Sequence, residues 1–192
     1  MVVDFCAGAG GKTLHLGALM DNRGTLYAFD VSAKRLAQLK PRLARAGLDN
    51  VRMVTIAHEN DERVRRLAGK IDRVLVDAPC SGTGTLRRNP DLKWRETDLA
   101  ALAENQLRIL TAAATLVKPG GRLVYATCSL LREENDEVVE KFLAGNNAFT
   151  LLPVAEILAR RQVALATDET VMRLLPHRQR CDGFFAAALE RS

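Results

Sequence analysis

Two cysteines and one aspartate are the side chains of this chain that best suit covalent chemistry. Asp77 and Cys80 lie in the run RVLVDAPCSGTG (73–84), in which an apolar strand gives way to small and polar residues. Cys128 lies near the end of a second run of the same design, RLVYATCS (122–129). Because open α/β sheets bind their ligands at the carboxyl ends of the strands, we expect two thiols and a carboxylate at one edge of a sheet.

The default role of each of these residues is structural. A cysteine is buried more often than it is reactive, and Cys6 and Cys181 fit that description. Cys80 and Cys128 differ because each follows a strand among small polar residues, and Cys128 also precedes an expected helix start that would favour its thiolate. Asp77 could cap the amides of its own loop as well as act in chemistry.

A glycine-rich turn, CAGAGGKT (6–13), follows the first expected strand. Its glycines let a ligand approach the backbone, and the next helix offers free amides at its start. A Walker phosphate loop would need glycine where Cys6 stands, and the dinucleotide fingerprint GxGxxG would need it where Thr13 stands. The third candidate is the S-adenosylmethionine site of Rossmann-like methyltransferases. There an acid at the end of the second strand binds the ribose hydroxyls, as Asp30 would, with Arg35 in the following helix.

A methyl donor beside two thiols and a carboxylate suits the methylation of cytosine. Carbon 5 of the ring is too poor a nucleophile to take a methyl group unaided, and a thiolate that adds to carbon 6 makes carbon 5 enamine-like. A carboxylic acid near ring nitrogen 3 would stabilise the adduct, and a second thiol would assist release. The residues alone leave open which cysteine attacks, because DNA cytosine methyltransferases use the cysteine of a proline-cysteine pair, which here is Cys80.

Strands and helices alternate along the chain with the period of a doubly wound, mostly parallel α/β sheet of the Rossmann-like type. The expected strands occupy residues 2–5, 25–32, 51–57, 73–77, 122–129, 149–154 and 182–190. The expected helices cover residues 14–20, 33–46 and 59–68, a long segment capped by Thr97, and a segment that begins at 132–135. The basic region before the last strand gives no firm prediction.

The composition of the chain limits the classes of function that it can have. At 192 residues and 47% hydrophobic content the chain suits one domain, and we expect a single catalytic domain over residues 1–192. Four separated cysteines without a CxxC pair argue against a zinc or thioredoxin-like site, so no metal is expected. With no long apolar run and no signal peptide, we expect a cytoplasmic protein with free thiols. The net charge of +5 is compatible with a polyanionic partner, and one basic group lies beside the expected site: Arg87, Arg88, Lys93 and Arg95.

Four segments carry a family resemblance: DFCAGAGGKT, DAPCSGTGTLRRNPDLKW, YATCS with EEN shortly after, and PHRQRCDGFF. Together they resemble the RsmB/Sun-type (NSUN-like) RNA cytosine-5 methyltransferases, and the likeness runs over essentially all 192 residues. It implies that Cys128 is the nucleophile, that Cys80 helps to expel the product, and that Asp77 contacts the cytosine beside the cofactor. It implies that S-adenosylmethionine is held by residues around the turn: Cys6, Ala7, Gly8, Ala9, Gly10, Gly11, Lys12, Asp30, Arg35 and Asp77. Lys12 would also face the reaction centre.

The resemblance also bears on partners. It implies an RNA substrate, ribosomal rather than transfer RNA, whose cytosine is single-stranded or flipped out so that it can be reached face-on. No membrane and no obligatory protein partner are inferred. Relatives usually carry extra residues before the glycine-rich turn, often an RNA-binding domain, so we expect a catalytic domain without that N-terminal part.

Two positions depart from the family pattern. Ala9 stands where proline is common, which relaxes the turn but keeps its amides available. Near the adenine the family usually has an aspartate, whereas this chain reads Ala57, His58, Glu59; His58 or Glu59 could substitute for it or lie in a solvated loop.

The segment RRNPDLKW (87–94) would grip phosphates around the target. Its Trp94 could stack on a base, although we expect it to pack in the core.

Two other functions stay open. A nucleoside triphosphatase would use GGKT (10–13) and the acid of VLVD (74–77) on magnesium, and Cys6 argues against it. A non-catalytic RNA-binding module would keep the fold alone, and the presence of both thiols and Asp77 argues against that.

Overall fold

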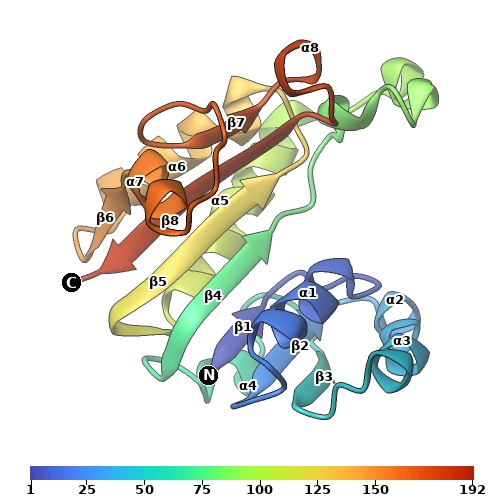
Figure 1. The fold of residues 1–192 in the computed structure, drawn as a ribbon, viewed down its shortest axis with the longest axis vertical. Helices are drawn as coiled ribbons and strands as arrows, with labels where there is room; N and C mark the ends of the chain where they lie inside the picture. The colour runs from blue at the N-terminus through green and yellow to red at the C-terminus, as the bar shows by residue number, and fades with distance from the viewer.

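The computed structural model describes all 192 residues and contains one eight-stranded sheet (Figure 1). The strands run in the order β3-β2-β1-β4-β5-β8-β6, and β7 pairs with β8. Their bounds are Val2–Asp4 (β1), Leu26–Asp30 (β2), Val51–Thr55 (β3), Ile71–Asp77 (β4), Val117–Thr127 (β5), Phe149–Leu152 (β6), Met172–Leu174 (β7) and Phe184–Arg191 (β8). Strands β1 to β5 are mutually parallel, and β8 is antiparallel to β5, β6 and β7. The predicted Rossmann-like, mostly parallel α/β sheet is therefore confirmed.

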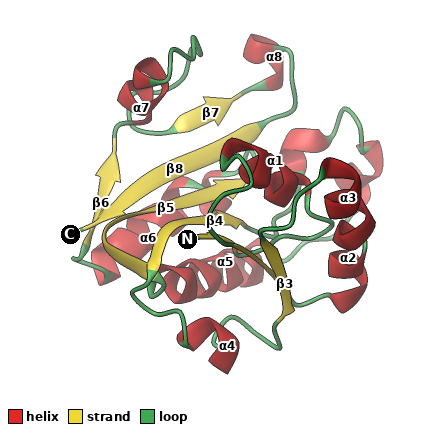
Figure 2. Cartoon of the chain, turned by 60° about the horizontal axis from the view of Figure 1, so that its bottom comes forward, coloured by secondary structure: helices red, strands yellow, loops and turns green.

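Helices cover both faces of the sheet, and Figure 2 shows α5 and α6 on the face opposite α1. The α-helices are Gly11–Leu19 (α1), Ala33–Ala37 (α2), Leu39–Ala46 (α3), Glu62–Arg65 (α4), Leu99–Ala114 (α5), Asp136–Gly145 (α6), Val154–Arg160 (α7) and Pro176–Gln179 (α8). Three short 3-10 helices are Thr83–Thr85 (η1), Pro90–Trp94 (η2) and Arg132–Glu134 (η3). The chain forms no helix with the length and apolar character needed to cross a bilayer.

The central strands β4 and β5 each contribute one fully buried face to the core. Val74 and Val76 of β4, and Leu123 and Tyr125 of β5, are each at most 1% exposed. These four residues alternate along their strands with half-buried residues, so one face of β4 and β5 is buried more completely than the other. Because β4 and β5 are paired in parallel, they end side by side, with Asp77 paired to Ala126.

The predicted single helix over 33–46 is wrong, because the structure has two helices there, α2 and α3, that meet at Gln38. Pro41 explains the break. Proline has no N–H for the carbonyl of Ala37 and its ring crowds that carbonyl, so one continuous helix cannot pass this point. The amide of Gln38 bonds instead to the carbonyl of Arg35.

Two further helix predictions need correction at their starts. The helix expected over 59–68 is the single turn α4, which begins after Asp61, a residue whose carboxylate accepts the amides of Ala57 and Arg63. The cap of α5 is Asp98, which accepts the amide of Ala101, and not Thr97. In both cases a carboxylate satisfies amides at a helix start, which favours aspartate as the cap.

Candidate active site

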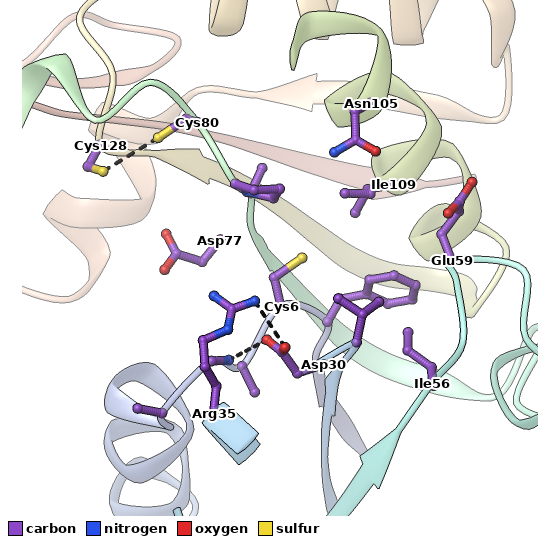
Figure 3. Close-up of a pocket in the computed structure, with 17 residues that line it drawn as sticks. Cys6, Asp30, Arg35, Ile56, Glu59, Asp77, Cys80, Asn105, Ile109 and Cys128 are labelled. Carbon is purple, nitrogen blue, oxygen red and sulfur yellow. Dashed lines mark hydrogen bonds and ion pairs between the residues drawn. The ribbon is translucent and has the colours of Figure 1, made fainter. Parts of the chain in front are cut away.

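A cavity of about 520 Å³ lies at the carboxyl ends of β1, β2 and β4, where the sheet order reverses between β1 and β4. This is where doubly wound sheets bind their ligands, and the volume suits a nucleoside-sized molecule. Nine of the residues predicted from the sequence line it: Cys6, Ala7, Gly8, Ala9, Asp30, Arg35, Asp77, Cys80 and Cys128 (Figure 3). Three predicted cofactor residues do not line the cavity: Gly10 is the N-cap of α1, and Gly11 and Lys12 are the first residues of that helix.

The two cysteine sulfurs meet at this cavity. Cys80 and Cys128 follow the paired residues Asp77 and Ala126 on neighbouring parallel strands, and their Sγ atoms lie 3.4 Å apart. A hydrogen bond from the Cys80 thiol lowers the pKa of Cys128 to about 7, and the same contact raises the pKa of Cys80. The pair therefore presents one thiol that ionises readily and one that holds its proton.

Backbone contacts fix the loops that carry the cysteines. The amide of Gly84 donates to the carbonyl of Cys128 at 2.8 Å, and the amide of Gly183 donates to the carbonyl of Gly84 at 2.8 Å. A Cβ atom on Gly84 would lie 2.3 Å from the oxygen of Gly183 and 2.7 Å from that of Cys128. Only glycine permits this approach, which brings the segment before β8 against both cysteine loops.

Asp77 forms an ion pair with Lys12, whose Nζ lies 2.6 Å from Oδ2. The same ammonium lies 4.9 Å from the centre of the Phe184 ring, at the start of β8. The charge and the ring together hold Lys12 beside Asp77, which lines the cavity. Sequence reasoning missed Phe184 as a site residue, and its only signal was its place in the segment PHRQRCDGFF.

Asp30 organises the glycine-rich turn. Its carboxylate is 3% exposed and accepts the amide of Gly8 at 2.8 Å on Oδ2, and the amide of Ser32 and the guanidinium of Arg35 on Oδ1. Gly8 has a φ of 56°, a conformation that glycine adopts without strain. Since each carboxylate oxygen has about two acceptor positions, Oδ2 keeps one for a ligand hydroxyl in the cavity.

The region expected near an adenine contains Glu59 and not His58. Glu59 lines the cavity and forms an ion pair with Arg108 at 3.4 Å, whereas His58 is exposed and accepts the amide of Asn60. Ile56 and Ile109 add apolar side chains to the wall of the cavity near Glu59 (Figure 3). Sequence reasoning offers Glu59 as a substitute for the family's aspartate but missed Ile56 and Ile109. Ile109 reaches the cavity because α5 packs against the sheet.

The loop between β4 and α5 extends away from the sheet (Figure 1). Trp94 in η2 is 81% exposed, so the prediction that it packs in the core is wrong: the 3-10 turn that carries it has no buried residue. Lys93 lies 5.5 Å from the centre of its ring, and Arg88 is held by Asp182 at 2.7 Å. The loop thus presents an aromatic face and positive charge together.

The buried carboxylate of Asp4 gives a prediction for stability. Asp4 is 0% exposed, Thr13 donates to its Oδ2 at 2.6 Å, and Oδ1 has no partner. Burial raises the pKa of Asp4 from 3.8 to about 6. Because the folded pKa lies above the ordinary value, ionisation costs folding free energy; the cost is absent below pH 4, grows up to pH 6 and is constant above.

We expect Asp4→Asn to raise the free energy of unfolding by about 3 kcal/mol at pH 8 and by almost nothing at pH 4. Asparagine keeps an acceptor for Thr13 and removes the buried charge. Urea unfolding at both pH values measures the difference. An equal effect at the two pH values would show that the charge of Asp4 is not the cause.

The thiol pair gives a prediction for reactivity. We expect the rate at which iodoacetamide alkylates Cys128 to rise about tenfold per pH unit below pH 7 and to level off above about pH 8. In Cys80→Ala, which removes the donor, the midpoint should move up toward the ordinary thiol value of about 8.5. Peptide mapping by mass spectrometry follows each cysteine separately, and an unchanged midpoint in Cys80→Ala would contradict the hydrogen-bond explanation.

Comparison with known proteins places this geometry in a family. A family model described as 16S rRNA methyltransferase RsmB/F matches residues 1–190. Ribosomal RNA small subunit methyltransferase B of Klebsiella pneumoniae is 38% identical over 193 residues, an alignment that covers 98% of this chain and 41% of that protein. Ribosomal RNA small subunit methyltransferase F of Cronobacter sakazakii is 36% identical over 196 residues, covering 100% of this chain and 40% of that protein.

A solved structure agrees with these matches. The crystal structure of NSun6 from Pyrococcus horikoshii with SFG superimposes with a TM-score of 0.84 at 30% identity, covering 100% of this chain and 47% of that one. The chain spans about two fifths of the length of the curated relatives that it matches. On the match over residues 1–190 and the geometry described above, the chain belongs to the 16S rRNA methyltransferase RsmB/F family.

Proposed function

We propose that this protein transfers a methyl group from S-adenosylmethionine to carbon 5 of a cytosine in ribosomal RNA, through a covalent bond to Cys128. The observation that carries the proposal is the 3.4 Å separation of the Cys80 and Cys128 sulfurs in the cavity that Asp30 also lines. Family membership supports an rRNA substrate and a methyl donor, and the NSun6 neighbour was solved with SFG. In this proposal residues 1–192 are the catalytic domain.

The residues around the turn suit an adenosine-containing methyl donor. Asp30 would bind the ribose through its free acceptor position, the amides of the turn would lie along the ligand, and Ile56 and Ile109 would flank the adenine. Glu59 would accept from the exocyclic amine of the adenine, in place of the family's aspartate. S-adenosylmethionine, when bound, supplies an electrophilic methyl group on a sulfonium. The end of the cavity away from Ile56 and Ile109 lies beside Asp77 and the cysteines (Figure 3).

The chemistry assigns a separate task to each thiol. The Cys128 thiolate forms a sulfur–carbon bond at carbon 6 of the cytosine, and carbon 5 gains nucleophilic character and takes the methyl group. Asp77 and Lys12 would face ring nitrogen 3, and the Lys12 ammonium would stabilise the electron density that this nitrogen gains. A water molecule then takes the proton from carbon 5, the electron pair left behind restores the double bond between carbons 5 and 6, and the sulfur–carbon bond breaks and returns its electron pair to Cys128 as a thiolate. Cys80, beside Cys128, assists this release.

The exposed loop between β4 and α5 supplies the contact to RNA in this proposal. Trp94 offers a face for a base, while Lys93 and Arg87 offer charge to phosphates. The target cytosine must be single-stranded or flipped out, because both faces of its ring are needed. We include no membrane and no obligatory protein partner, and we place the protein in the cytoplasm, where thiols stay reduced.

Incubation with 16S rRNA fragments and labelled S-adenosylmethionine tests the proposal. The expected product is 5-methylcytidine, identified by mass spectrometry of the digested RNA. A methyl group on another atom would contradict the proposed chemistry. Isothermal titration separates the alternatives: binding of ATP with magnesium in place of S-adenosylmethionine would indicate a nucleoside triphosphatase, and binding of RNA without transfer would indicate a non-catalytic module.

A further inference from the structure

Glu134 is a fully buried carboxylate between the two cysteine loops. It is 0% exposed and accepts four hydrogen bonds. The amides of Ser81 (backbone) and Gln106 (side chain) donate to Oε1 at 2.8 and 2.9 Å, and the hydroxyls of Ser81 and Ser129 donate to Oε2. All the acceptor positions of the carboxylate are therefore used, and none of these partners is a cation.

The partners of Glu134 have one property in common: each is the neighbour of a cysteine or is hydrogen-bonded to such a neighbour. Ser81 follows Cys80 and Ser129 follows Cys128. Gln106 uses the second proton of its amide on the carbonyl of Pro79, which precedes Cys80, at 2.9 Å. One carboxylate thus connects to both sides of Cys80 and to the residue after Cys128.

Asn135 completes the arrangement on the other loop. Its amide donates to the carbonyl of Ser129 at 3.0 Å, and its oxygen accepts the hydroxyl of Thr127, the residue before Cys128. Glu134, Asn135 and Gln106 together therefore bond to all four neighbours of the two cysteines. Every one of these contacts joins elements that are distant in sequence or separated by a turn.

A buried carboxylate without a cation lowers the stability of the fold, and apolar side chains of similar volume in its place would make the fold more stable. What apolar packing cannot do is fix two loops by directional bonds at the same time. We propose that Glu134 is a positioning residue that holds the Cys80 and Cys128 loops in register, so that the two sulfurs stay within contact distance. This inference deepens the proposed function, since the spacing matters for catalysis only if both thiols act on one cytosine.

The distance between the sulfurs can be tested without RNA. Diamide oxidises two thiols to a disulfide: one sulfur–sulfur bond forms, two S–H bonds break, and the N=N bond of the reagent takes up both hydrogens. The rate depends on how closely the sulfurs approach, because a shift of about 1 Å in a reacting pair can cost up to about a hundredfold. Mass spectrometry of non-reduced peptides identifies the Cys80–Cys128 bond and separates it from any bond to Cys6 or Cys181.

Three variants make the test specific. Glu134→Ala should slow formation of the Cys80–Cys128 disulfide by at least about tenfold. Glu134→Gln should stay within about threefold of the parent protein, because its oxygen accepts the two amides and its own amide donates to the two serine hydroxyls. Glu133→Ala is the matched control, since Glu133 is the exposed neighbour in the same 3-10 turn, and it should have no effect.

Thermal unfolding and circular dichroism confirm that each variant is folded. If Glu134→Ala does not fold, the double variant Ser81→Ala with Ser129→Ala removes the two hydroxyl contacts and should slow the disulfide severalfold. The proposal would be overturned if the folded one of these two variants, Glu134→Ala or the double serine variant, formed the disulfide at the rate of the parent protein. It would also be overturned if Glu134→Gln formed the disulfide as slowly as Glu134→Ala. Because the readout needs neither RNA nor methyl transfer, its failure is distinguishable from failure of the proposed function. In the methylation assay, Glu134→Ala should lower kcat with little change in the KM for S-adenosylmethionine, and Glu134→Gln should restore kcat.

Discussion

Replacement of Cys128 by alanine is expected to lower methyl transfer by at least about a thousandfold while the affinity for S-adenosylmethionine stays the same. Without the thiolate, carbon 5 of cytosine remains too weak a nucleophile to take the methyl group. The matched control is Cys181→Ala, because Cys181 does not line the cavity and its thiol donates to the carbonyl of Asp182. Single-turnover transfer to RNA, with the cofactor affinity from isothermal titration, separates chemistry from binding.

The companion variant, Cys80→Ala, should behave differently. The higher pKa of Cys128 slows attack at neutral pH without preventing it, whereas release loses its assistance altogether, so covalent protein–RNA complexes should accumulate on denaturing gels. The reverse pattern, with accumulation in Cys128→Ala and loss of transfer in Cys80→Ala, would exchange the roles of the two cysteines.

Replacement of Asp30 by alanine is expected to weaken S-adenosylmethionine binding by about ten- to a hundredfold. A hydrogen bond to a charged group contributes about 1.5–3 kcal/mol, and loss of about 3 kcal/mol is about a hundredfold in affinity. The variant also removes the partner of the Gly8 amide and of Arg35, so the turn loses its anchor.

Asp98→Ala is the control for this experiment. Asp98 also accepts a backbone amide at a helix start, but it does not line the cavity, so the affinity should not change. Isothermal titration measures both variants. An affinity within about threefold of the parent protein in Asp30→Ala would show that Asp30 is not the ribose-binding residue.

The positions of the cysteines could be predicted from the sequence because they depend on local rules. Each follows an apolar run, and parallel strands in one sheet end at the same edge. The pairing of Asp77 with Ala126 in β4 and β5 is what brings Cys80 and Cys128 together. The position of Asp30 could be predicted in the same way, because it is the acid that ends β2.

Features that depend on contacts between distant segments could not be predicted. Phe184 reaches Lys12 only because β8 inserts antiparallel beside β5, and Ile109 reaches the cavity only because α5 packs against the sheet. The exposure of Trp94 follows from a loop that leaves the sheet, which its apolar side chain gave no reason to expect. Elements α7, β7 and α8 lie in the basic region whose pattern favoured neither helix nor strand.

Proline and buried charge account for the other differences. Pro41 was visible in the sequence, and its effect on the helix over 33–46 follows from its missing N–H. The burial of Glu134 was not visible, since EEN reads as a solvated turn until the loops that carry Ser81 and Ser129 are seen around it.

The covalent mechanism can be tested most directly with an RNA that carries 5-fluorocytosine at the target position. Fluorine on carbon 5 leaves no proton to remove after methyl addition, so the bond to the enzyme persists. Incubation with S-adenosylmethionine, followed by proteolysis and mass spectrometry, should find the methylated fluoropyrimidine nucleotide on the peptide that contains Cys128, and none in Cys128→Ser. Its presence on the Cys80 peptide, or no adduct on either peptide although the unmodified RNA is methylated, would contradict this account.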